Sequence, residues 1–240
     1  MDTDITTTLR SLKSRGINGF YAENREEAIV KILDLIPQKA VVGVGDSTTM
    51  FQIGILTALK NKGTKVLNRF EKGISKTLRD DMMTESAMCN VFLTGTNAIT
   101  RDGKLVNVDA VGNRVAGMFF GHTLSVIVVG RNKLVGNLDA AFHRIRNQIA
   151  PNHIRIRSVE LGGRRVKTPC VATGVCSDCN SRERMCNVFT IIEGKPLRTD
   201  INVVIINEDL GLAWDESWPK ERISRIIEEY KRYVWVPAPD

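Results

Sequence analysis

The sequence predicts an α/β fold in which a mostly parallel sheet carries helices on both faces. Short apolar runs bounded by glycine, such as residues 40–45 and 124–130, alternate with segments of helical period through the middle of the chain. Strand and helix units in series form parallel sheets, because each crossover helix returns the chain to the same edge. At 240 residues the chain also suits one large domain with its own core. We therefore expect a single domain over residues 1–240.

The first half of the chain supplies clear element boundaries. A helix is expected over residues 22–37, because Asn24 can cap it and Glu27 stands three residues later, as in a capping box. Apolar residues 40–45 follow as a buried strand. Residues 47–63 are expected to form a helix that ends at a glycine, and residues 64–70 form the next strand.

The middle of the chain continues the alternation. We expect a helix around residues 74–86, a strand over residues 90–99, and a hairpin over residues 100–109 that turns at Asp102 and Gly103. The remaining units are two helices and the strand between them, over residues 113–120, 124–130 and 137–150.

Beyond Pro151 the sequence changes character. A basic stretch leads into a cysteine-rich loop over residues 168–187, which we expect to be inserted in the domain together with an antiparallel strand pair. The two strands of this pair and the C-terminal amphipathic helix that follows are expected over residues 187–194, 200–208 and 216–234.

The net charge of +7 is concentrated in one segment. Between His143 and Lys167 the only acid is Glu160. Such a segment can bind nucleic acid, an anionic substrate or an acidic protein such as an electron carrier, or it can be a solvated helix face. Because it has no aromatic residues, we expect no nucleic-acid partner. Its basic residues are Arg144, Arg146, Arg155, Arg157, Arg164, Arg165 and Lys167.

The apolar runs are all much shorter than the roughly 18 residues of a membrane helix. The first residues are polar and do not resemble a targeting segment. We therefore expect a cytoplasmic protein without a membrane partner, assembled as a homo-oligomer. In that compartment thiols stay reduced, and clustered cysteines usually bind metal.

Ligands of open α/β sheets bind in the crevice at the carboxyl ends of the strands. After the strand at 40–45, the residues at the expected helix start offer free N–H groups and hydroxyls to an anion, although the P-loop lysine is missing. Polar residues also crowd the loops at 94–103 and 107–117, where they could orient a polyol or carboxylate or simply form turns. The candidate ligand-binding residues are Gly45, Asp46, Ser47, Thr48, Thr49, Asn97, Asn113 and Arg114, and the catalytic candidates are Asp109 and Asn97.

Four of the five cysteines form the pattern Cys170-x5-Cys176-x2-Cys179-x6-Cys186. Four thiolates make a complete ligand set for tetrahedral zinc or for an iron-sulfur cluster. Structural zinc generally uses two short CxxC pairs and only one is present, so the spacing favours a four-iron cluster, with zinc as the alternative. A disulfide or sulfur relay at the CxxC pair is a further alternative.

The remaining sulfur and imidazole side chains are expected to have ordinary roles. Cys89 begins a strand and is expected to be a buried small hydrophobe. His122, His143 and His153 are not spaced as metal ligands, and we expect surface or capping roles for them.

Three motifs in order, "TGTNAITRDGKLVNVDAVGNRVAGMFFG", "VIVVGRNKLV" and "TPCVATGVCSDCNSRERMCN", resemble those of the LUD-domain family of lactate-utilisation proteins, as does "INEDLG". The resemblance covers essentially the whole chain. It implies a fold related to ribose-5-phosphate isomerase, glucosamine-phosphate isomerase and the CoA transferases. It also implies a role in oxidising lactate or a similar small hydroxy acid beside iron-sulfur subunits.

Two departures from the isomerase relatives affect the functional interpretation. Those relatives place an acid/base aspartate where Asn97 stands, and an amide cannot shuttle protons. Their lysine after the second matched asparagine is replaced by Val108. A sugar-phosphate isomerase using Asp109 or Glu85 as base is therefore an alternative only. A second alternative is a regulatory ligand-binding protein with structural zinc.

The sequence thus predicts an oxidoreductase, or a subunit of one. A small anionic ligand would bind at the strand ends, and an iron-sulfur cluster on the four cysteines would exchange electrons with an iron-sulfur or electron-carrier protein.

Overall fold

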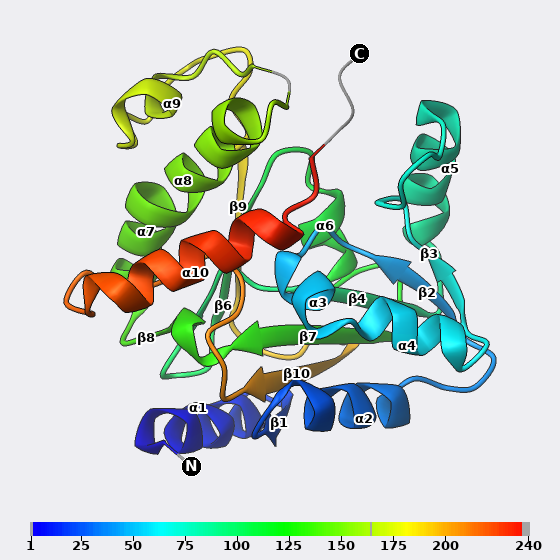
Figure 1. The fold of residues 1–240 in the computed structure, drawn as a ribbon. Coiled ribbons are helices and arrows are strands. Elements are labelled where there is room, and N and C mark those ends of the chain that lie inside the picture. The colour runs from blue at the N-terminus through cyan, green and yellow to red at the C-terminus, as the bar shows by residue number, and fades with distance from the viewer. Residues whose placement is uncertain (1, 164, 237–240) are drawn as a thin grey trace.

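The computed structural model describes residues 2–163 and 165–236, so Arg164 of the basic stretch lies outside the described residues. Its centre is a six-stranded sheet in the order β1-β10-β7-β4-β2-β3, with every neighbouring pair parallel (Figure 1). The expected α/β fold with a mostly parallel sheet is confirmed. The strands are β1 (Asn18–Ala22), β2 (Val41–Val44), β3 (Lys65–Leu67), β4 (Val91–Gly95), β7 (Leu124–Gly130) and β10 (Asp200–Ile206).

A second, mixed sheet packs against the first. Its order is β8-β5-β6-β9, with β5 and β6 antiparallel, β6 and β9 antiparallel, and β5 and β8 parallel. The turn between β5 and β6 contains Asp102 and Gly103, as predicted, and Gly103 has a φ of 86° that glycine adopts readily. These strands are β5 (Ala98–Thr100), β6 (Leu105–Asp109), β8 (Leu134–Val135) and β9 (Val188–Ile192).

The two faces of the large sheet bury different partners. Val126 and Val128 of β7 belong to a core with α2, α3 and α4, whereas Ile127 and Val129 belong to a core with α1, α6 and the small sheet. This division follows the alternation of side chains along a strand. The helices are α1 (Thr3–Ser14), α2 (Arg25–Leu35), α3 (Thr48–Ile53), α4 (Ile55–Asn61), α5 (Lys76–Ser86), α6 (Asn113–Gly117), α7 (Leu138–Arg144), α8 (Ala150–Arg155), α9 (Pro169–Thr173) and α10 (Lys220–Tyr233).

Three expected elements are corrected by the structure. The strand expected over residues 90–99 divides into β4 and β5, which belong to different sheets. The helix expected over residues 47–63 is interrupted at Gly54, which has a φ of 74°. The strands β9 and β10 do not pair with each other, because β9 extends the small sheet while β10 is inserted in the large sheet between β1 and β7. The strand β1 was not predicted.

The helix after β8 is longer than predicted and continues through Pro151. It begins as α7, where Asn137 accepts a hydrogen bond from Ala140 N as the cap, and it runs on to Glu160. Two segments, Ile145–Ile149 and Ile156–Glu160, are π-helical and flank α8. The wider π turn before Pro151 accommodates a residue that lacks a backbone donor. Much of the basic stretch is therefore helical.

The sheet connectivity creates a crevice next to β2. After β2 the chain continues to β3, which lies on one side of β2 in the large sheet. After β4 the next strand of this sheet is β7, which lies on the opposite side of β4. The direction of the strand order therefore changes between the neighbouring strands β2 and β4. Ligand sites of open sheets lie at such a switch point, outside the carboxyl ends of the strands. No helix in the described ranges has both the length and the apolar character needed to cross a membrane.

The close approach of the β2 loop to its neighbours gives a testable prediction. A Cβ atom at Gly45 would lie 2.6 Å from Thr94 Oγ1 and 2.8 Å from Arg114 Cγ. We expect Gly45→Ala to lower the free energy of unfolding by about 1–3 kcal/mol in urea denaturation, because overpacking forces these buried groups apart. Gly136→Ala is the matched control, since a Cβ there meets no atom of the described residues within 4 Å. Equal stabilities of the two variants would contradict the expectation.

Candidate functional site

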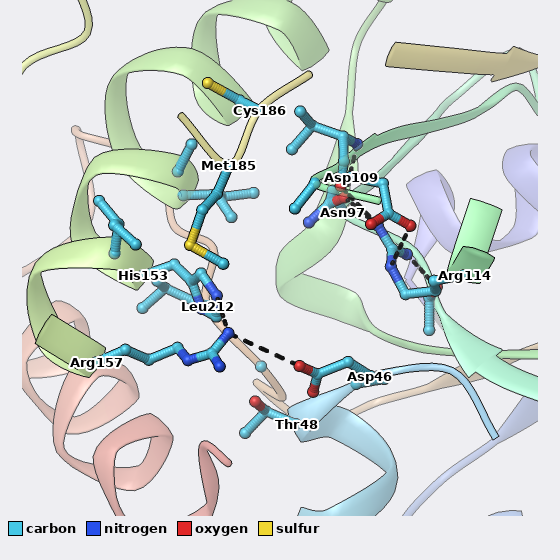
Figure 2. A pocket seen from close by; sticks show the side chains of 18 of the residues that line it. Asp46, Thr48, Asn97, Asp109, Arg114, His153, Arg157, Met185, Cys186 and Leu212 are labelled. Atoms are coloured by element: carbon cyan, nitrogen blue, oxygen red, sulfur yellow. Dashed lines mark hydrogen bonds and ion pairs between the residues drawn. The ribbon is translucent and has the colours of Figure 1, made fainter. Parts of the chain in front are cut away.

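The strand ends enclose a pocket of about 300 Å³. Its floor is formed by residues that follow β2, β4, β7 and β10. Its sides come from the long helix over residues 138–160, from α10 and from the cysteine loop. Figure 2 shows His153 and Arg157 on one wall, with Asn97, Asp109 and Arg114 on the facing wall. The pocket thus gathers segments that are far apart in the sequence at the predicted edge of the sheet.

A buried arginine organises the wall formed by the loops that follow β4 and β6. Arg114 is 8% exposed, and its guanidinium donates to Gly95 O at 3.2 Å and Val108 O at 2.8 Å. It also donates to Asn107 Oδ1 and Asn97 Oδ1, both at 3.0 Å. Because an arginine has five N–H donors in a fixed fork, it can hold these oxygens in one plane. Arg114 therefore positions the wall, and its donors are largely committed to protein acceptors.

The two catalytic candidates take part in the same network. Asn97 Oδ1 also accepts from Val108 N at 3.0 Å. Asp109 accepts from Val115 N at 3.1 Å and lies 3.8 Å from Arg114 Nε. Both residues line the pocket, but these contacts hold loops in place. The alternative base Glu85 lies on α5, is paired with Lys65 at 2.8 Å, and is not among the residues that line the pocket.

On the opposite wall a chain of polar contacts runs from the loop after β2 to α10. Arg157 Nη1 lies 3.9 Å from Asp46 Oδ2 and 3.3 Å from His153 Nε2, as Figure 2 shows. The other ring nitrogen of His153 contacts the Tyr230 hydroxyl, which also bonds to Thr48. An arginine can only donate, so Nε2 is the acceptor and we assign the imidazole proton to Nδ1.

The pKa values in this chain are shifted mainly by burial. Burial, with the positive charges of Arg157 and Arg114, lowers the pKa of His153 to about 3, so the imidazole is neutral at physiological pH. Burial also raises the pKa of Asp46 above its ordinary value, although nearby arginines oppose that shift. The Asp46 side chain keeps 29% exposure and lines the pocket, and its raised pKa favours the protonated form there more than in water.

A lysine lines the pocket beside the loop after β2. Lys133 follows β7, is 6% exposed, and donates from Nζ to Thr49 Oγ1 at 3.0 Å. Burial, reinforced by the positive charge of Arg114, lowers the pKa of this amine to about 7. A substantial fraction of Lys133 is therefore neutral at physiological pH.

A further arginine lines the pocket without a carboxylate partner in the described part of the chain. The Arg69 guanidinium contacts Met83 Sδ at 3.6 Å and lies 4.8 Å from the centre of the Phe70 ring. Its buried Nε has no hydrogen-bond partner among the residues that the structure describes. Five basic and two acidic side chains of the described residues line the pocket, so an anionic ligand is favoured. The basic set is Arg69, Arg114, Lys133, Arg157 and Arg184.

The cysteine loop closes the pocket from above. Cys170, Cys179 and Cys186 line it, whereas Cys176 does not. Arg184 donates to the carbonyls of Cys179 and Cys186 at 2.7 and 3.1 Å, which fixes this part of the loop. All four thiols are free and partly exposed. The thiols therefore lie over the same pocket as Asn97 and Asp109.

The loop supplies soft sulfur donors, but its present spacing does not complete a coordination shell. Within residues 2–163 and 165–236, no three His, Cys, Asp or Glu side chains are grouped closely enough to hold a metal ion. The chemistry of four free thiols on one loop still suits zinc or an iron-sulfur cluster. The metal assignment stays a prediction.

The predicted ligand-binding residues differ in how they contribute. Most of them line the pocket, whereas Gly45 faces Thr94 and Arg114 instead. The hydroxyls of Thr48 and Thr49 are bonded to Tyr230 and Lys133. The predicted residues that line the pocket are Asp46, Ser47, Thr48, Asn97, Asp109, Asn113 and Arg114.

The structure also tests the roles expected for the histidines and for Cys89. The surface or capping role expected for the histidines is wrong for His122, which is 5% exposed and stacks on Phe92, and for His153. Cys89 is buried, as predicted.

Three pocket residues were not singled out from the sequence. Lys133 could have been noticed because it follows a predicted strand at the same edge of the sheet as the other loops. No local pattern marks Arg69 or Tyr230 as pocket residues.

The neutral state of His153 makes stability depend on pH. A histidine whose pKa falls from its ordinary 6.5 to about 3 on folding binds fewer protons in the native than in the unfolded state. Its contribution to stability is therefore present above pH 6.5 and is lost as the pH falls toward 3. We expect His153→Gln to reduce the loss of unfolding free energy across this window by roughly 1–2 kcal/mol.

Denaturation of both proteins at several pH values measures this difference. His143→Gln serves as control, because the His143 side chain is 60% exposed. An unchanged pH profile for His153→Gln would contradict the assignment of a neutral imidazole at this position.

Comparison with known proteins agrees with the motifs of the sequence. A model of the LUD domain matches residues 5–206. No curated protein matches the chain. A crystal structure of a DUF162 family protein from Deinococcus radiodurans shares 17% identity over 76% of this chain and 98% of that chain, with a TM-score of 0.28. On the strength of the domain match, the chain belongs to the LUD domain family, which is linked to lactate utilisation.

Proposed function

We propose that this LUD-domain protein binds a small carboxylate of the lactate and pyruvate class in the pocket, and that the four-cysteine loop holds an iron-sulfur cluster for electron transfer. One observation carries the proposal. Three of the four cysteines line a pocket that also contains an excess of basic side chains. An anion bound there would lie beneath the thiols, so ligand and cluster would be close to each other.

The charges of the pocket support a small anionic ligand. Arg157 and Arg184 have the carboxylates of Asp46 and Asp178 nearby, at 3.9 and 3.0 Å. Arg69 and Lys133 have no carboxylate at ion-pairing distance within the part of the chain that the structure describes. A ligand carboxylate would supply the missing negative charge, and a charge-assisted hydrogen bond is stronger than a neutral one. A pocket of about 300 Å³ has room for a carboxylic acid of a few carbon atoms.

The remaining pocket groups have defined roles in this proposal. Arg114 keeps the strand-end wall in place, and the contact between Arg157 and His153 orients Arg157 toward Asp46. Asp46, with its raised pKa, is the group best suited to hold a proton beside a bound ligand. Asn97 and Asp109 act as positioning residues, since their oxygens accept hydrogen bonds from the loops.

The metal assignment rests on the donors themselves. Cys170, Cys176, Cys179 and Cys186 would hold the cluster, and bound there it would supply one-electron transfer to a protein partner. Arg184 and the arginines of the long helix after β8 would offset the negative charge of the thiolates. With zinc at the same cysteines, the loop would be a structural clip and the protein a regulatory ligand-binding protein.

Replacing one loop cysteine tests the cluster. We expect anaerobically purified protein to contain iron and acid-labile sulfide with visible charge-transfer absorption. Cys179→Ser should lose most of both, because the cluster would lack a thiolate ligand. Cys89→Ala is the control, since Cys89 is buried away from the loop and should leave iron content unchanged. Colourless protein with stoichiometric zinc would contradict the electron-transfer role.

Removing an unpaired pocket charge tests the ligand class. We expect Arg69→Gln to weaken binding of lactate or pyruvate by roughly 10- to 100-fold in calorimetric titrations, because a hydrogen bond to a charged group contributes about 1.5–3 kcal/mol. Arg10→Gln is the matched control, since Arg10 is exposed on α1. Equal affinities for both variants, or no saturable binding by the unaltered protein, would contradict the proposed ligand class.

A further inference from the structure

Lys133 has features that ion-pairing lysines lack. Its side chain is 6% exposed in a pocket wall, and its hydrogen-bond partner is the hydroxyl of Thr49 at 3.0 Å. Among the described residues it has no carboxylate at ion-pairing distance. Burying a charged amine without an acid is unfavourable, so this environment favours the neutral amine.

The chain also keeps space free around this amine. A Cβ atom at Gly211 would lie 2.8 Å from both Lys133 Nζ and Thr49 Oγ1. Gly211 has a φ of 69°, which also favours glycine, and it lines the pocket beside the lysine. The loop after β10 therefore leaves room at Lys133 Nζ that any larger residue would fill.

A neutral amine in a partly desolvated pocket is a nucleophile toward carbonyl carbon, and a neighbouring cation strengthens this character. Lys133 meets both conditions, because burial and the positive charge of Arg114 lower its pKa to about 7. A 2-oxo acid places a carbonyl carbon next to a carboxylate. The pocket that holds Lys133 has an excess of basic side chains, which favours a ligand with such a carboxylate.

We propose that Lys133 forms a reversible imine with a 2-oxo acid bound in the pocket. This inference rests on the proposed function in one respect, that the ligand is a small carboxylate. The amine nitrogen bonds to the carbonyl carbon while the carbonyl π electrons move to oxygen, which gives a carbinolamine after proton transfer from nitrogen. The carbon–oxygen bond then breaks, the carbon–nitrogen double bond forms, and both amine hydrogens leave with the oxygen as water. No oxidation or reduction is involved.

The imine can be trapped by reduction. The protein is incubated with pyruvate and sodium cyanoborohydride at pH 7 and digested, and its peptides are analysed by mass spectrometry. We expect one reduced pyruvyl group on the peptide containing Lys133, in large excess over labelling of exposed lysines such as Lys39. Lactate should suppress the labelling, because it has the carboxylate but no carbonyl. Labelling spread evenly over surface lysines would overturn the proposal.

Two variants and a binding measurement separate this inference from the proposed function. Lys133→Arg keeps a positive charge but cannot form the imine, so it should lose the label, whereas Lys39→Arg should retain it. The labelled lysine is identified by mass spectrometry in the unaltered protein, so this result holds even if a variant fails to fold. Pyruvate binding measured by ligand-observed NMR, without labelling of Lys133, would overturn the imine and leave the proposed function standing. Absence of both pyruvate and lactate binding would overturn both.

Discussion

The pocket depends on the hydrogen bonds of one buried guanidinium. Arg114 donates hydrogen bonds to Gly95, at the end of β4 in the large sheet, and to Asn107 and Val108 of β6 in the small sheet. It also donates to Asn97, which lies between β4 and β5. Buried polar networks are stable only when their members are satisfied, and replacing this arginine would remove one donor from each of these oxygens. Among the described residues, Asn97 Oδ1 and Asn107 Oδ1 would keep only the backbone donors Val108 N and Asn97 N. The relative position of the two sheets, and hence the shape of the crevice, follows from this contact.

The second wall is set by the unusual helix that follows β8. Its π-helical segments let the chain continue through Pro151, which brings His153 and Arg157 opposite the strand ends. Burial between these walls has opposite effects on acids and bases, since it raises the pKa of Asp46 and lowers the pKa values of Lys133 and His153. The pocket therefore holds an amine that titrates near neutrality, a neutral imidazole and a carboxyl group with a raised pKa next to fixed positive charges.

Much of the fold was predictable because strands and caps have local signals. The Asn24 cap of α2 accepts from Glu27 N at 2.9 Å, and the buried strands β2 and β7 lie where apolar runs predict them. The partners of β9 and β10 were not predictable, because pairing depends on contacts distant in sequence. The strand-end loops were located from the sequence, but the commitment of Arg114 and Asp109 to protein contacts was not. Arg69, Lys133 and Tyr230 become pocket residues only through the fold.

A small carboxylate is proposed to bind between the strand-end loops and the long helix, under the cysteine loop. A crystal structure of the protein grown with pyruvate or lactate shows whether it does. We expect density for the ligand among the basic side chains of this pocket, with the hydrogen bonds of Arg114 unchanged. Ligand found only outside this pocket, or a pocket that stays free of it at saturating concentration, would overturn the proposed binding site.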